Sequence, residues 1–175
     1  MTEQFCGTCY ACCVYLDIKE LNKWGGQHCN HLNGVDCPEK RCSIYQRRPE
    51  ACSSYRCAWL QGCFDEDLRP NACGVLVTGY DIDGERSITL NVFDQSRAGS
   101  IVDPHSPICR IIADLPPELT KNIFIRFFPG RKVIILQEGK VFKGKVSRDR
   151  KLEELKIEYD ADGIGRFEIR ASGVE

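Results

Sequence analysis

The sequence predicts an α+β protein in which a cysteine-rich N-terminal half of short helices and loops packs on an antiparallel sheet with one or two helices. Two observations lead to this class. Eleven of the twelve cysteines lie in residues 1–73, and the chain beyond residue 74 alternates apolar and polar residues between turn signals. We therefore expect two regions, residues 1–73 and residues 74–175, packed together as one unit.

Four thiols are crowded into one short run near the N-terminus. They are Cys6, Cys9, Cys12 and Cys13. The spacing of the first three lets their sulfurs turn toward one point, which is typical of metal chelation, whereas Cys13 points elsewhere from the adjacent backbone position. A bacterial ferredoxin motif begins in the same way, but Leu16 and Asp17 stand where its next Cys-Pro belongs. We expect a second metal ion or a multinuclear cluster.

The N-terminal sequence gives an expectation about compartment. It has neither a basic segment nor an apolar segment of the kind found in secretory leaders, and no apolar run of 18 residues occurs in the chain. We therefore expect a cytoplasmic protein without a membrane segment. In a reducing compartment thiols bind metal more often than they form disulfides, so a disulfide framework is disfavoured.

Charge is nearly balanced, with a formal net charge of -1. Eight thiolates on two divalent ions would add -8 + 4 = -4 to the cysteine-rich region, so nucleic acid is not expected to bind there. Residues 126–151 carry nine basic and two acidic residues. Solvated strand faces explain that excess, and an acidic protein partner is the alternative.

Residues 18–24 have helical spacing of apolar residues. Asp17 and Glu20 form a capping-box pattern before and within this segment, Gly25-Gly26 ends it, and Trp24 is interpreted as a core residue. Residues 27–41 are polar and rich in turn formers, so we expect ligands to hold them in place. Their metal-binding candidates are His28, Cys29, His31 and Cys37. Whether either histidine is a ligand stays open.

Pro49 and Glu50 suit the first turn of a helix, which we expect to run to residue 61 and to end at Gly62. Such a helix would place Cys52 and Cys57 about 140° apart, so the two thiols would serve different centres. Arginines surround these thiols and either favour thiolate or are ordinary surface residues. They are Arg47, Arg48 and Arg56.

Four segments together closely resemble the CxxCxxCC proteins. They are the cysteine run at the N-terminus, the Cys29-x2-Leu32 element, the segment from Cys42 to Cys52 and the sequence Cys57-Ala-Trp-Leu. This YkgJ-like cysteine-cluster family consists of zinc- or iron-chelating domains, and the resemblance covers residues 5–63. It implies a metal centre held by eight cysteines: Cys6, Cys9, Cys12, Cys13, Cys29, Cys42, Cys52 and Cys57. One branch is a flagellin lysine methylase associated with an iron-sulfur cluster, but its members are much longer than this chain.

Cys37, Cys63 and Cys73 are extra to the family pattern, and Cys109 lies beyond the cysteine-rich region. Cys73 begins a strand pattern and Cys109 lies on the apolar face of a predicted helix, so we expect these two to be structural.

The second half of the chain carries clear strand and turn signals. Asp83-Gly84 predicts a hairpin between residues 74–82 and 85–93, and Ser106-Pro107 predicts a helix that ends at Leu115. Further strands are expected at residues 123–128, 131–137, 140–146 and 166–171. Residues 152–159 fit either a helix or a strand.

Three functions compete. The first is a metal centre, with an iron-sulfur cluster or more than one ion on about eight thiolates, for redox or group-transfer chemistry. The second is a protein-interaction module stapled by zinc and without catalysis. A thiol-disulfide redox protein ranks last because the chain lacks a βαβ pattern beside a Cys-x-x-Cys pair. Protein lysine methylation is a remote alternative, by analogy with the flagellin methylase branch.

Overall fold

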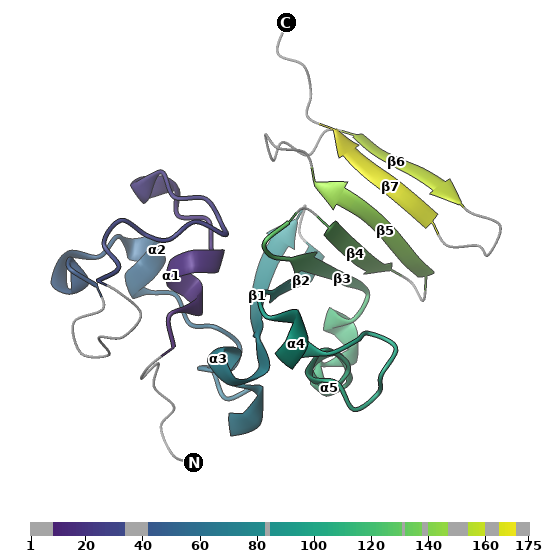
Figure 1. Ribbon diagram of the computed structural model, residues 1–175, viewed down its shortest axis with the longest axis horizontal. Helices are drawn as coiled ribbons and strands as arrows, with labels where there is room; N and C mark the ends of the chain where they lie inside the picture. The colour runs from purple at the N-terminus through teal and green to yellow at the C-terminus, as the bar shows by residue number, and fades with distance from the viewer. Residues whose placement is uncertain are drawn as a thin grey trace, which may run out of the picture.

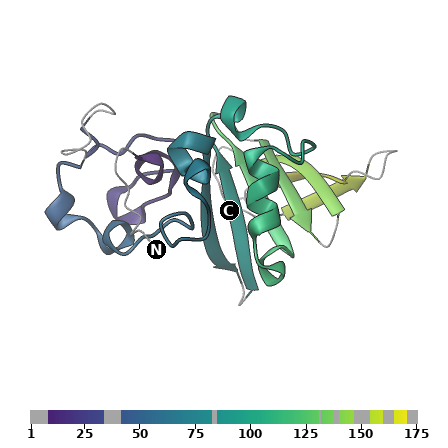
Figure 2. The same cartoon turned by 90° about the horizontal axis from the view of Figure 1, so that it is seen from below.

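The computed structural model describes residues 9–33, 42–82, 85–130, 132–137, 140–146, 154–159 and 165–170. These residues form an α+β fold, which confirms the predicted class. The cysteine-rich region lies on one side of a sheet and helices lie on the other (Figure 1, Figure 2). The strands are β1 Val75–Ile82, β2 Glu85–Val92, β3 Asn122–Phe127, β4 Lys132–Gln137, β5 Lys140–Val146, β6 Glu154–Tyr159 and β7 Gly165–Arg170.

The helices are short. The α-helices are α1 Ala11–Tyr15, α2 Glu50–Ser53, α3 Pro70–Cys73, α4 Gln95–Ala98 and α5 Pro107–Asp114. The 3-10 turns are η1 Lys19–Leu21, η3 Tyr45–Arg47, η4 Glu66–Leu68 and η5 Pro117–Leu119. The helix predicted after Ser106 is confirmed as α5, because the Ser106 side chain accepts a hydrogen bond from the Cys109 amide at 3.3 Å.

The described strands make one sheet in the order β1-β2-β3-β4-β5-β7-β6. The predicted hairpin is confirmed, with Ile82 opposite Glu85 in an antiparallel β1–β2 pair. The ambiguous segment 152–159 provides strand β6. The sheet is nevertheless mixed and not wholly antiparallel, because the β2–β3 and β5–β7 pairs are parallel. The β2–β3 connection contains α4 and α5, which gives the chain the length that a parallel crossover requires.

The main core lies between the sheet and α5. It contains the fully buried Ile108 and Ile111 of α5 packed against alternate residues of β1 to β4. Segment 57–73 joins the same core from the N-terminal region, since Trp59, Phe64 and Leu68 are buried there. Apolar side chains from both sides of residue 73 are therefore removed from water together, which is the main source of folding free energy.

The opposite face of β1 and β2 holds the cysteine-rich region. Leu76 is buried there against Ala11, Leu16 and Ile18 in a second, smaller cluster, which we call the thiol-side cluster. The Tyr15 ring stacks on Phe93 with centroids 4.5 Å apart. The N-terminal region is thus fixed to the sheet by apolar contacts as well as by its own turns.

The helix predicted for residues 18–24 is wrong. A single 3-10 turn, η1, is followed by Asn22 in the left-handed conformation, and Lys23 then pairs with Ile18 in an antiparallel bridge. Asp17 does not cap a helix, because its carboxylate accepts a hydrogen bond from the Gly25 amide at 2.7 Å and lies 3.8 Å from Arg126 of β3. A tertiary partner has displaced the local capping arrangement.

The prediction that Trp24 is a core residue is also wrong. Its side chain is 53% exposed, and the buried tryptophan is Trp59 at 4%. Gly26 has φ +85, and a Cβ there would lie 2.9 Å from the Phe128 ring, so the glycine lets the chain pass close to the sheet. Trp24 is carried outward by the tight turn that this approach requires.

The predicted helix of residues 49–61 begins as expected but ends after one turn at Ser53. The Ser53 and Ser54 hydroxyls donate to the Glu50 carbonyl at 3.3 and 2.6 Å, and such side-chain bonds compete with continued helix. A separate turn follows, in which the Gln61 amide donates to the Cys57 carbonyl at 3.1 Å. The expected separation of Cys52 and Cys57 around one helix is therefore wrong.

Candidate metal centre

The first cysteine run is partly described and carries a helix. Cys12 and Cys13 lie in α1, which begins directly after Cys9 and Tyr10, and Cys6 lies outside the described residues. The helix buries Ala11 and Val14, so its position is set by apolar packing. Cys9 and Cys12 are half-buried against the thiol-side cluster.

Backbone hydrogen bonds bring two further cysteines to this helix. The Cys29 amide donates to the Cys13 carbonyl at 3.1 Å, which fixes the loop after η1 against α1. Leu32 then pairs with Cys42 in an isolated antiparallel bridge, and the Ser43 amide donates to the His31 carbonyl at 2.9 Å. Cys29 and Cys42 are therefore held by main-chain contacts at the side of the first run.

Cys52 and Cys57 approach from the α2 segment. Both pack against the thiol-side cluster, as Cys9 and Cys12 do, and all four are half-buried. The Leu60 amide donates to the Cys57 sulfur at 3.4 Å. Two separate stretches of chain, residues 9–12 and 52–57, thus place predicted ligand cysteines against one small apolar cluster.

The acid-base behaviour of Cys52 gives a second sign of this gathering. Burial raises the pKa of the Cys52 thiol, and the negative charges of Cys13, Cys29 and Cys42 raise it further. Charges that act on one another in this way lie within a short distance in a partly desolvated region. Cys52 therefore shares its surroundings with thiols from other stretches of the chain.

The described side chains include sulfur donors, but they do not have the geometry of a metal centre. Among them, no group of three or more histidine, cysteine, aspartate or glutamate residues is arranged to hold one ion. Thiolate sulfur is the ligand that zinc and iron-sulfur clusters share, so the donor type fits both. Seven of the eight cysteines predicted as ligands are described, and every one is half-buried.

The extra cysteines lie in other surroundings. Cys63 is exposed, Cys73 is buried in the main core, and Cys109 belongs to α5 on the far side of the sheet. The Cys73 thiol donates to the Leu68 carbonyl at 3.3 Å, and the Cys109 thiol donates to the Ile101 carbonyl at 3.2 Å. These contacts agree with structural roles for Cys73 and Cys109. Cys37 falls outside the described residues.

The two histidines border a small polar pocket beside Cys29. Its volume is about 70 Å³, and His28, His31, Cys29 and Lys23 are among the residues that line it. The Nδ1 atom of His31 lies 3.4 Å from the Ser43 hydroxyl. Both imidazoles thus line the same pocket as Cys29, a cysteine predicted as a ligand.

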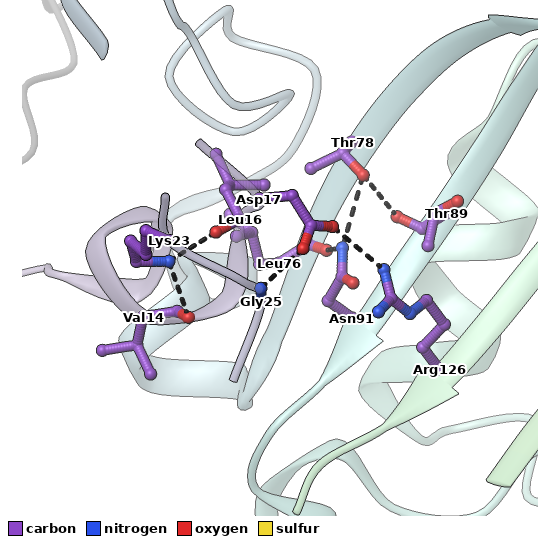
Figure 3. A network of polar contacts seen from close by, with 10 residues as sticks. All are labelled: Val14, Leu16, Asp17, Lys23, Gly25, Leu76, Thr78, Thr89, Asn91 and Arg126. Atoms are coloured by element: carbon purple, nitrogen blue, oxygen red, sulfur yellow. Dashed lines mark hydrogen bonds and ion pairs between the residues drawn. The ribbon is translucent and has the colours of Figure 1, made fainter. Parts of the chain in front are cut away.

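Sequence reasoning missed Lys23, the one charged side chain that the described residues bury in this region. It is 5% exposed, and its ammonium donates to the Leu16 carbonyl and, at 3.0 Å, to the Val14 carbonyl (Figure 3). Burial lowers the pKa of Lys23, whereas the negative charges of Cys29, Asp17, Cys13 and Cys12 raise it. The sequence shows only a lysine between Asn22 and Trp24, and lysines are mostly found on protein surfaces.

The fold and this site define an α+β protein with a cysteine cluster set against one face of its sheet. The chain matches no family model, no curated protein and no solved structure. Over the part of the chain that the structure describes, every helix is too short or too polar to cross a membrane. The function is therefore argued from the arrangement of the cysteines.

Proposed function

We propose that this protein binds an iron-sulfur cluster or more than one metal ion through about eight cysteine thiolates. The ligands would be Cys6, Cys9, Cys12, Cys13, Cys29, Cys42, Cys52 and Cys57. A centre of this kind supplies redox or group-transfer chemistry when iron-sulfur is bound. Thiolates in such number require reducing surroundings, so we place the protein in the cytoplasm.

One observation carries the proposal. The stretches that contain Cys13, Cys29 and Cys52 are far apart in sequence, yet the first two are joined by a backbone hydrogen bond and both act electrostatically on the third. A mononuclear tetrahedral site uses four thiolates. The eight cysteines proposed as ligands exceed that number, which supports a centre with more than one metal ion.

Several features support a metal as the element that completes this region. Helix α1 has five residues, α2 has four, and the thiol-side cluster contains only four buried residues. Such short helices are marginal without tertiary support, and metal binding supplies folding free energy on the order of 10 kcal/mol in small zinc domains. The metal would therefore determine the stability of the region as well as its chemistry.

The first test is to purify the protein without air, to record its visible spectrum and to count iron, zinc and sulfide per chain. Absorption by an iron-sulfur chromophore, or two or more metal ions per chain, supports the proposal. A fully loaded protein with one ion per chain, or a protein that takes up no metal after anaerobic reconstitution with iron and sulfide or with zinc, contradicts it.

Variants assign the ligands. Cys9→Ser should remove the ion or cluster held by the first run, and Cys13→Ser should lower the metal content in part, because adjacent cysteines direct their sulfurs to different positions. Cys63→Ser, at an exposed thiol outside the family pattern, is the matched control and should retain the full metal content. Equal metal content in Cys13→Ser and the parent would show that Cys13 is no ligand.

The second candidate is a zinc-stapled interaction module without catalysis. It is favoured by two exposed aromatic side chains in the cysteine-rich region, Trp24 at 53% and Tyr45 at 58%. Aromatic residues are enriched at protein interfaces. A colourless protein that contains only zinc would favour this module, and an iron chromophore would exclude it.

A further inference from the structure

Lys23 is buried at the end of the helix that carries two of the proposed ligands. Its ammonium donates to the carbonyls of Val14 and Leu16 (Figure 3), at the C-terminal end of α1, where carbonyls lack helical partners and where the helix dipole favours a cation. The Gly26 amide also donates to the Val14 carbonyl at 2.8 Å. The segment from Lys23 to Gly26 therefore closes the end of α1.

The backbone of Lys23 is fixed independently of its side chain. The Lys23 amide donates to the Ile18 carbonyl at 3.1 Å, and the Ile18 amide donates to the Lys23 carbonyl at 2.8 Å. Ile18 is itself buried in the thiol-side cluster. The ammonium is thus delivered to one place by a rigid bridge, and not by a mobile surface chain.

Three thiols and one carboxylate surround this cation. Lys23 and Cys29 line the same small pocket, and Cys12, Cys13, Cys29 and Asp17 all interact electrostatically with the ammonium. A lysine is almost never buried without a compensating charge, because desolvation of an ammonium is unfavourable. Thiolates that hold a metal carry more negative charge than the metal ion neutralises, so they provide that compensation.

We infer that Lys23 is a positioning residue of the proposed metal centre: its ammonium holds the end of α1, which places Cys12 and Cys13, and serves as the internal countercharge of the thiolates. The inference rests on the proposed function. It assigns to one side chain both a geometric role and an electrostatic role, and substitution by methionine removes both.

Cobalt(II) is a suitable probe because thiolate-to-cobalt charge transfer is visible and responds to charge beside the sulfur. The Lys23→Met variant keeps the length of the side chain and removes its charge and its donors. We expect it to bind cobalt and zinc 10 to 100 times more weakly than the parent, the usual effect of losing a residue that supports metal ligands. Its charge-transfer band should move to longer wavelength, because a cation that stabilised the sulfur electrons is gone.

Two further variants serve as controls. Lys23→Arg keeps the charge and the donors, and should bind within a few-fold of the parent with its band unmoved. Lys19→Met removes an exposed lysine of the neighbouring η1 turn and is the matched control, for which neither affinity nor spectrum should change.

Equal affinity and an identical spectrum in Lys23→Met and the parent would overturn the inference while leaving the metal centre intact. If Lys23→Met does not fold, Lys23→Arg decides, because a tenfold or larger loss of affinity in that variant would also overturn it. A parent protein that binds neither zinc nor cobalt would instead refute the proposed function itself.

Discussion

The buried thiol of Cys73 makes the stability of the protein depend on pH in the alkaline range. Cys73 is 2% exposed, at the end of α3, and its thiol donates to the carbonyls of Leu68 and Val75. Burial raises the pKa of this thiol from 9.0 to about 11. In the folded protein the proton is therefore retained at pH values where the unfolded chain releases it.

The direction and size of the effect follow from this difference. The stabilisation is fully present below the unfolded pKa of 9.0 and is lost as the pH rises through about 11. Each pH unit in that interval removes about 1.4 kcal/mol from the free energy of unfolding, so the whole interval removes about 3 kcal/mol. Cys73→Ala should lower the stability by about 1 kcal/mol at neutral pH through lost packing, without this alkaline decline.

The assay is urea unfolding of the parent and of Cys73→Ala, equally loaded with metal, from pH 7 to pH 11 under reducing conditions. Fluorescence of the buried Trp59 reports on the core that contains Cys73. The two stabilities should cross at roughly pH 10, with the variant more stable above it. Cys63→Ala, at an exposed thiol, controls for the general effect of alkali. A difference between parent and Cys73→Ala that stays constant up to pH 11 would refute the reasoning.

Three further predictions concern the fold and the cysteine-rich region. Gly74→Ala should lower the free energy of unfolding by about 2 to 4 kcal/mol, because Gly74 has φ +75 and a Cβ there would lie 2.5 Å from the Asp94 carbonyl oxygen. Gly62→Ala is the control: Gly62 has φ +81 but open space around it, so the loss should be only about 1 kcal/mol. Equal losses for the two variants in denaturant titrations would contradict the steric argument. Ser106→Ala should cost about 1 kcal/mol or more in the same titrations, since the hydroxyl caps α5 and donates to the Ser100 carbonyl at 2.7 Å. Removal of metal by a chelator should destabilise residues 5–63, and thermal melting with and without chelator measures this effect. An unchanged melting temperature in a demonstrably metal-free sample would show that metal does not stabilise this region.

The strands and the main helix of the second half of the chain could be predicted from the sequence, because the patterns that indicate them involve only neighbouring residues. Alternation of apolar residues around the turn signal Asp83-Gly84 predicted the β1–β2 hairpin, and a serine followed by a proline predicted the start of α5. The strand order could not be read in the same way. Which strand lies beside β2 depends on how the crossover that contains α4 and α5 packs over the sheet, and that packing is a long-range property.

The cysteine-rich half shows where local rules fail. Asp17 matched a capping pattern, yet its carboxylate is used by Gly25 and Arg126. Asn22 takes the left-handed conformation that ends the turn of η1. The contact between Asp17 and Arg126 joins residues distant in the chain, and such contacts outweigh a helix preference of a few tenths of a kcal/mol per residue.

Three properties of this protein can be read from its residues alone: the large number of thiols, their spacing near the N-terminus, and the positions at which strands and turns begin. Those properties depend on residue type and on near neighbours. The exposure of Trp24, the burial of Trp59 and the position of Lys23 inside the molecule could be seen only in the folded structure. Burial is a property of packing between distant segments, and an ammonium is stable in the interior only where those segments bring carbonyls and negative charge to meet it.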